Sequence, residues 1–82
     1  MTMQKINLLD VVALTTDLPA YKLYRGQVGT VVEILADGDA FEVEFSDQNG
    51  RTYESVGLRD TQIMVLHFEP IAPESAPVAV TV

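Results

Sequence analysis

The sequence predicts an all-β protein, a small SH3-like five-stranded barrel with a short helical turn before the last strand. Residues 41–45, FEVEF, alternate strictly between apolar and polar, which is the period of a half-buried strand. Asp37 and Gly38 stand between two such runs and form a strong hairpin signal. No segment shows the pattern of a long amphipathic helix. The 82 residues suffice for one small domain, and closure into a barrel would hide its strand edges.

The first predicted strand covers residues 10–15, a β-branched run. Pro19 interrupts that run, so we expect an irregular loop over residues 16–25. The loop is too apolar for a segment that only faces water. We therefore expect its large side chains to fold back over one end of the core: Tyr21, Leu23 and Tyr24.

The second predicted strand begins between Gly26 and Gly29 and runs to Leu35. A two-residue turn at Asp37 and Gly38 fixes its pairing with the third strand. The expected pairs are Ile34 with Phe41, Val32 with Val43, and Thr30 with Phe45. On this register Val28, Thr30, Val32 and Ile34 face inward, whereas Val31 and Glu33 face outward.

The second predicted hairpin turns at residues 46–53, SDQNGRTY. Asp47 and Gly50 suit the first and fourth positions of a type I turn, with Gly50 in the left-handed conformation of a bulge. The resulting three-residue loop pairs Phe45 with Tyr53 and opens a fourth strand at residues 52–56. We expect three aromatic side chains in the core: Phe41, Phe45 and Tyr53.

The sequence next predicts one helical turn within residues 57–62 and a fifth strand at residues 63–68. The barrel domain is therefore assigned to residues 1–68. Residues 69–82 form a proline-rich tail that ends in VAVTV. The sequence leaves two interpretations of this tail open: a flexible linker, or a strand that adds to its own barrel or to a neighbour's edge and so forms a homo-oligomer.

Charge bears on the class of partner. The chain carries 12 acidic and 5 basic residues, a formal net charge of −7. Binding to nucleic acid requires lysine and arginine, so this balance disfavours it and favours a basic protein partner. The sequence contains no apolar run of signal-peptide or bilayer length, so we expect a cytoplasmic protein that makes no membrane contact.

The two hairpin registers predict an acidic stripe on the outer face of the sheet. Glu33 falls opposite Glu42, and Glu44 falls opposite Glu54. Like charges in direct cross-strand contact are destabilising. One interpretation is a solvated face that deters edge-to-edge aggregation. The other is a docking surface for a basic protein, whose charge sets the rate and selectivity of binding.

No residue pattern supports catalysis, a cofactor or a metal. The chain has no cysteine, no nucleophile elbow and no phosphate-binding glycine loop, and the aspartates near Gly38 suit turn geometry rather than calcium. His67 is the only histidine, and nothing places it beside Ser46 or Ser55. We therefore expect a protein that is not an enzyme and holds neither cofactor nor metal.

The irregular loop is the second candidate surface. Tyr21 and Tyr24 lie among Lys22 and Arg25, an aromatic and basic composition found where such modules bind peptides or single-stranded nucleic acid. The alternative is that both tyrosines cap the barrel and leave only their hydroxyls in water. The candidate partner-binding residues are thus Tyr21, Tyr24, Arg25, Glu33, Glu42, Glu44 and Glu54.

The motifs DVVAL, RGQVGTVVE and FEVEF, in this order, resemble a family of small bacterial proteins known only as a domain of unknown function. The resemblance covers about residues 6–67, and such proteins are frequent in cyanobacteria and proteobacteria. It implies an SH3-like barrel, often encoded beside a partner gene in arrangements that suggest toxin–antitoxin or accessory pairs. It transfers no catalytic residue.

A looser similarity is to the KOW motif of ribosomal and transcription factors, through Gly26, Gly29 and the valines that follow. Members of that group carry basic flanking loops, whereas this strand is followed by Glu33 and an acidic turn. The leading hypothesis is therefore a non-enzymatic module for a protein partner, antitoxin-like or accessory. The alternative is a nucleic-acid- or ribosome-associated module that uses Lys22, Tyr24, Arg25 and Arg51.

Overall fold

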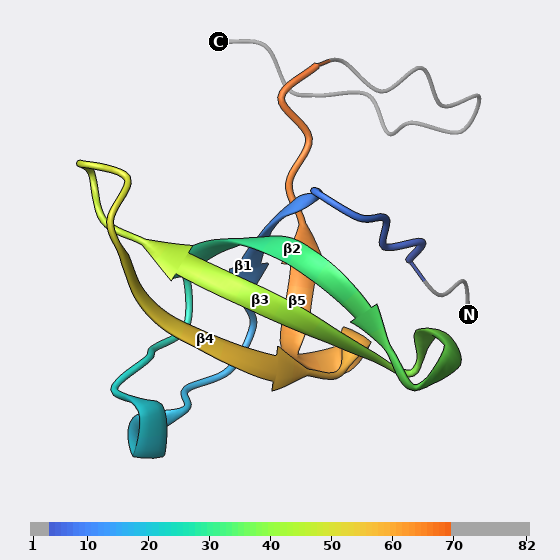
Figure 1. The fold of residues 1–82 in the computed structure, drawn as a ribbon, viewed down its shortest axis with the longest axis horizontal. Helices are drawn as coiled ribbons and strands as arrows, with labels where there is room; N and C mark the ends of the chain where they lie inside the picture. The colour runs from blue at the N-terminus through green and yellow to red at the C-terminus, as the bar shows by residue number, and fades with distance from the viewer. Residues whose placement is uncertain (1–3, 70–82) are drawn as a thin grey trace, which may run out of the picture.

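The computed structural model describes residues 4–69 and contains one antiparallel sheet of five strands (Figure 1). The strands lie in the order β4-β3-β2-β1-β5, so consecutive strands are neighbours and the last strand returns beside the first. The strands are β1 (Val11–Leu14), β2 (Val28–Leu35), β3 (Ala40–Ser46), β4 (Thr52–Leu58) and β5 (Ile63–Val65). Three short 3-10 turns connect them: η1 (Pro19–Tyr21), η2 (Ala36–Gly38) and η3 (Asp60–Gln62).

The predicted fold class is confirmed. The sheet curls strongly, so that β2, β3 and β4 lie in front of β1 and β5 in Figure 1. The 3-10 turn η3 immediately precedes the last strand, as expected. Within residues 4–69, β4 and β5 are the two edges of the sheet and do not pair with each other, so hydrogen bonds between these two strands do not close the barrel.

The core lies inside the curl and draws on every strand. Its largest fully buried side chains are Phe45, Leu23, Ile63, Val12, Val31 and Val43. Leu23 comes from the loop between β1 and β2, so this part of the loop folds over the core as predicted. The buried residues of the described chain are all apolar, apart from the backbone of Gly29. Burial of apolar surface is thus the main stabilising contribution.

The predicted facing of β2 is wrong over its first half. Ile34 pairs with Phe41 and Glu33 with Glu42, as expected, but Val31 rather than Val32 pairs with Val43. Val32 is the extra residue of a β-bulge, and a shift by one residue reverses which side chains point inward. Val31 is therefore fully buried, whereas Val28 and Val32 are exposed. Ile34, which was also expected to face inward, is 45% exposed although it pairs with the buried Phe41.

Gly29 gives the physical reason for this register. It pairs with Phe45, where Thr30 was expected. A Cβ atom on Gly29 would lie 2.7 Å from Cγ1 of Val43 and 3.0 Å from Cδ1 of Phe45. Only a residue without a side chain fits at this position, so the glycine takes the inward place and Thr30 faces outward.

β4 contains a second bulge that the sequence analysis did not predict. The three-residue loop forms as expected: the Gly50 amide donates to the Asp47 carbonyl, and Gly50 has φ 78°. Ser46 then pairs with Thr52, but Phe45 pairs with Glu54 rather than with Tyr53. Tyr53 is the extra residue, and it is exposed instead of lying in the core.

The remaining differences from the prediction concern two strand ends and one turn. β4 is longer than predicted and β5 ends at Val65 rather than at residue 68. Leu35 pairs with Ala40 as expected, but the loop between them spans residues 36–39 and contains η2 instead of a two-residue turn. The proposed tail, apart from Glu69, lies outside the described residues, so the domain boundary and the role of VAVTV stay predictions.

Candidate partner-binding surfaces

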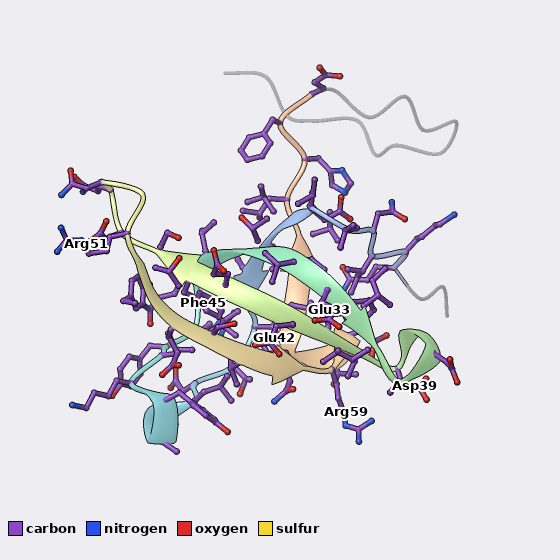
Figure 2. The ribbon with its side chains drawn as sticks, viewed as in Figure 1. Glu33, Asp39, Glu42, Phe45, Arg51 and Arg59 are labelled. Carbon is purple, nitrogen blue, oxygen red and sulfur yellow. The ribbon has the colours of Figure 1, made fainter. Side chains whose placement is uncertain are left out.

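The acidic face, defined as Glu33, Glu42 and Glu44, lies on the outer side of β2 and β3. Glu33 sits directly opposite Glu42, and Glu44 lies between Thr30 on β2 and Ser55 on β4. Figure 2 shows Glu33 and Glu42 near the middle of the sheet. The predicted opposition of Glu33 and Glu42 is therefore confirmed.

Hydroxyl groups on β4 hold two of these carboxylates. The Ser55 hydroxyl donates to Oε2 of Glu42 at 2.6 Å, and the Thr52 hydroxyl donates to Oε1 of Glu44 at 3.0 Å. Gly57, opposite Glu42, has no side chain to crowd it. Both carboxylates therefore lean toward β4, which moves the Glu42 charge away from Glu33 on β2 and reduces their repulsion.

Glu54 does not belong to the acidic face, which corrects the predicted stripe. Because of the bulge at Tyr53, Glu54 lies opposite Phe45 and Glu44 lies opposite Ser55. The Oε1 atom of Glu54 accepts a hydrogen bond from the Ser55 amide at 3.1 Å. The expected pair of Glu44 and Glu54 is absent, since one extra residue moves Glu54 to the other side of the sheet.

The loop between β1 and β2 is ordered by its own backbone bonds. Leu18 and Leu23 form an isolated antiparallel bridge, with the amide of each donating to the carbonyl of the other at 2.8 and 3.2 Å. η1 forms the tip of this small hairpin and carries Tyr21. Farther along, the Arg25 amide donates to Oδ1 of Asp17 at 2.9 Å. These hydrogen bonds define the conformation of the loop, whose polar and aromatic side chains face outward.

Gln27 joins this loop to β4. Its Oε1 atom accepts a hydrogen bond from the Tyr24 amide, and its Nε2 donates to the hydroxyl of Tyr53 at 3.0 Å. The Gln27 amide also donates to the Tyr24 carbonyl at 3.1 Å, across a turn in which Gly26 has φ 93°. One glutamine side chain therefore fixes Tyr53 relative to the backbone of Tyr24.

All three tyrosines are half exposed: Tyr21 at 48%, Tyr24 at 51% and Tyr53 at 48%. The expectation that Tyr21 and Tyr24 cap the core with only their hydroxyls in water is therefore wrong. From this loop, Leu23 is buried in the core and Leu18 packs against it. We call Tyr21, Tyr24 and Tyr53 the tyrosine surface. The sequence analysis did not identify Tyr53 and Gln27 as surface-site residues. A tyrosine at the end of a strand could have indicated a partly exposed position, because its hydroxyl is polar and its ring is apolar.

Basic residues accompany the tyrosine surface. Lys22 and Arg25 are exposed on the same loop, and Arg51 lies at the β3–β4 turn. Figure 1 shows that this turn and the η1 loop lie at one end of the molecule, whereas η2 lies at the opposite end. Arg51 and Asp39 mark these two ends in Figure 2. Three of the five basic residues thus accompany the tyrosines at this end, whereas Arg59 lies toward the Asp39 end in Figure 2.

In the part of the chain that the structure describes, His67 makes no hydrogen bond with Ser46 or Ser55, the residues considered for catalysis. The hydroxyls of Ser46 and Ser55 contact Thr52 and Glu42, respectively, and His67 is exposed beyond the end of β5. Within residues 4–69, no three histidine, cysteine, aspartate or glutamate side chains form a group that could hold a metal ion. The same part of the chain has no helix long and apolar enough to cross a membrane.

The comparisons with known proteins identify a family without a described activity. No curated protein and no solved structure matches the chain. The family described as a domain of unknown function (DUF4926) matches residues 8–65, a range that includes all five strands, the acidic face and the tyrosine surface. The chain therefore belongs to the DUF4926 family.

Proposed function

We propose that this protein is a non-enzymatic module that binds a protein partner. One observation carries the proposal: three half-exposed tyrosines lie on the β1–β2 loop and at the start of β4, and the Gln27 side chain joins this loop to this strand. Tyrosine is enriched at protein interfaces because its ring adds apolar contact area and its hydroxyl makes a hydrogen bond. A pre-positioned ring also loses little conformational freedom on binding.

The acidic face supports a basic partner. Glu33 and Glu42 are held opposite each other although such a pair weakens the sheet, and the net charge of the chain is −7. A partner rich in lysine and arginine would be attracted to this face and would compensate its repulsion. An antitoxin-like or accessory role is the specific form of this function that the family resemblance suggests.

The test is affinity capture from the native host at moderate salt, with and without nuclease. We expect one stoichiometric protein that resists nuclease. The double variant Tyr24→Ser/Tyr53→Ser should lose this protein. Phe68→Ser is the matched control, because Phe68 is an aromatic residue exposed at 80% that follows β5 and is not part of the tyrosine surface.

A second pair of variants tests the acidic face. Glu42→Lys/Glu44→Lys should lose the partner, whereas Asp39→Lys/Glu69→Lys makes the same change in net charge at exposed positions elsewhere. Circular dichroism establishes that each variant is folded. Capture that survives in both folded test variants would contradict the proposal, and material that disappears with nuclease would favour nucleic acid.

A further inference from the structure

The outer edge of β5 has the geometry of a strand-addition site. The Leu66 amide donates to the Val11 carbonyl and the Thr15 amide to the Gln62 carbonyl, both at 2.9 Å, so these positions of the last strand face β1. Backbone groups alternate sides along a strand. The amide of Val65 and the carbonyl of Ile63 therefore point away from the sheet, where a sixth strand would bond.

Gln4 occupies these two groups with its side chain. Its Nε2 donates to the Ile63 carbonyl at 2.6 Å and to the Asp60 carbonyl at 3.0 Å, and its Oε1 accepts from the Val65 amide at 3.1 Å. A carboxamide has one acceptor and a donor, like a peptide group. Gln4 thus imitates one peptide unit of a neighbouring strand and covers an edge that would otherwise be open to pairing.

We propose that Gln4 is a replaceable cap, and that the β5 edge binds an extended segment of a protein partner by strand addition. The backbone of an incoming strand would replace the hydrogen bonds that Gln4 makes to β5, almost one for one. The Gln4 residue is exposed and Ile6, two residues farther along, is buried in the core, so the exchange involves the Gln4 side chain while Ile6 stays in place. This inference goes beyond the proposed function, because the edge shares no residue with the tyrosine surface or the acidic face.

The neighbours of β5 specify the chemistry of that segment. On the outer side, Met64 lies beside Ala13, and Ala13 beside Val28, so an added strand would extend an apolar row. On the inner side it would lie next to Ile63 and Val65, which face the core. The segment should therefore be uncharged over three or four residues and rich in small β-branched side chains, which suit a pleated surface.

The probe is a nine-residue synthetic peptide in which valine and threonine alternate between terminal lysines. It is titrated into the full chain, and the amide resonances of Ile63, Val65 and the Gln4 side chain are followed by NMR. Gln4→Ala should bind this peptide about tenfold more tightly, because competing hydrogen bonds are removed. Lys5→Ala is the matched control and should leave the affinity unchanged.

Backbone methylation of the peptide gives an independent test that needs no protein variant. N-methyl groups along the peptide edge that faces β5 should abolish binding, and the same groups along the opposite edge should not. Equal binding of the two methylated peptides, or equal affinity of wild type and Gln4→Ala, would overturn the proposal. Binding that emerges only after removal of residues 70–82 would also overturn it, in favour of the chain's own terminal segment. None of these results depends on the tyrosine or glutamate variants, so failure here is separable from failure of the proposed function.

Discussion

Glu33 and Glu42 lie directly opposite each other across β2 and β3, on the outer face of the sheet. The pair stands immediately beside the bulge at Val32, where the register of the two strands changes. The Ser55 hydroxyl holds the Glu42 carboxylate on the β4 side. Within residues 4–69, no hydroxyl group bonds the Glu33 carboxylate in the same way. The arrangement concentrates negative charge at the middle of the sheet at a cost in stability.

Removal of the Glu33 charge should therefore stabilise the protein. We expect Glu33→Gln to raise the free energy of unfolding by about 0.2–1 kcal/mol, because a like-charged cross-strand pair is relieved. Urea denaturation at low and high salt measures the change, and the gain should shrink with salt. Asp39→Asn removes one charge from the hairpin loop at a position with an ordinary right-handed backbone conformation, φ −86°, and serves as the control. An equal gain in both variants would mean that only net charge matters.

Two glycines should respond in opposite ways to alanine. In Gly29→Ala the new Cβ would lie 2.7 Å from Cγ1 of Val43 and 2.9 Å from the Glu44 carbonyl oxygen. We expect a loss of about 1–3 kcal/mol in unfolding free energy from this overpacking.

Gly57→Ala is the matched comparison, since its nearest contacts would lie at 3.7 Å. This substitution should be neutral or stabilise by up to about 1 kcal/mol, because alanine loses less backbone entropy on folding. Thermal unfolding of both variants tests the inward register of Gly29. Similar stabilities for the two would contradict that register.

The bond between Gln27 and Tyr53 should appear as an energetic coupling. In a double-mutant cycle of Gln27→Ala and Tyr53→Phe, we expect an interaction of about 0.5–1 kcal/mol, the usual net contribution of one hydrogen bond. Chemical denaturation of the wild type, both single variants and the double variant supplies the four values. A coupling of zero would mean that Gln27 does not fix the tyrosine surface in solution.

Nucleic acid should bind weakly. The tyrosine surface has only Lys22, Arg25 and Arg51 beside it, within a chain of net charge −7. We expect no measurable binding of a fluorescent single-stranded RNA of twelve uridines at physiological salt, by anisotropy. Affinity that falls steeply with salt and is lost in Tyr24→Ala would instead establish the alternative function.

Much of the fold follows from local sequence. Alternation in FEVEF, the glycine and aspartate turns and the proline in the first loop predict the strands and their connections, because these patterns act over a few residues. The pairing of Glu33 with Glu42 follows in the same way, since both lie close to the hairpin turn that sets their register.

Two bulges limited the prediction of the candidate site. Val31 and Val32 have identical side chains, so nothing in their own chemistry selects which one is buried. The crowding of Gly29 by Val43 and Phe45 selects Val31, and that contact exists only when β2 and β3 have assembled. The bulge at Tyr53 likewise takes Glu54 off the acidic face.

The sequence by itself determined the all-β class, the positions of the two hairpin turns, the helical turn before the last strand and the opposition of two glutamates. Only the tertiary structure decided which valine enters the core, that Tyr53 meets Gln27 at the surface, and that Gln4 covers the edge of β5. The physical reason is that side chains alternate across a strand with a period of two. A single extra residue, chosen by packing between distant segments, exchanges the inside and the outside of everything beyond it.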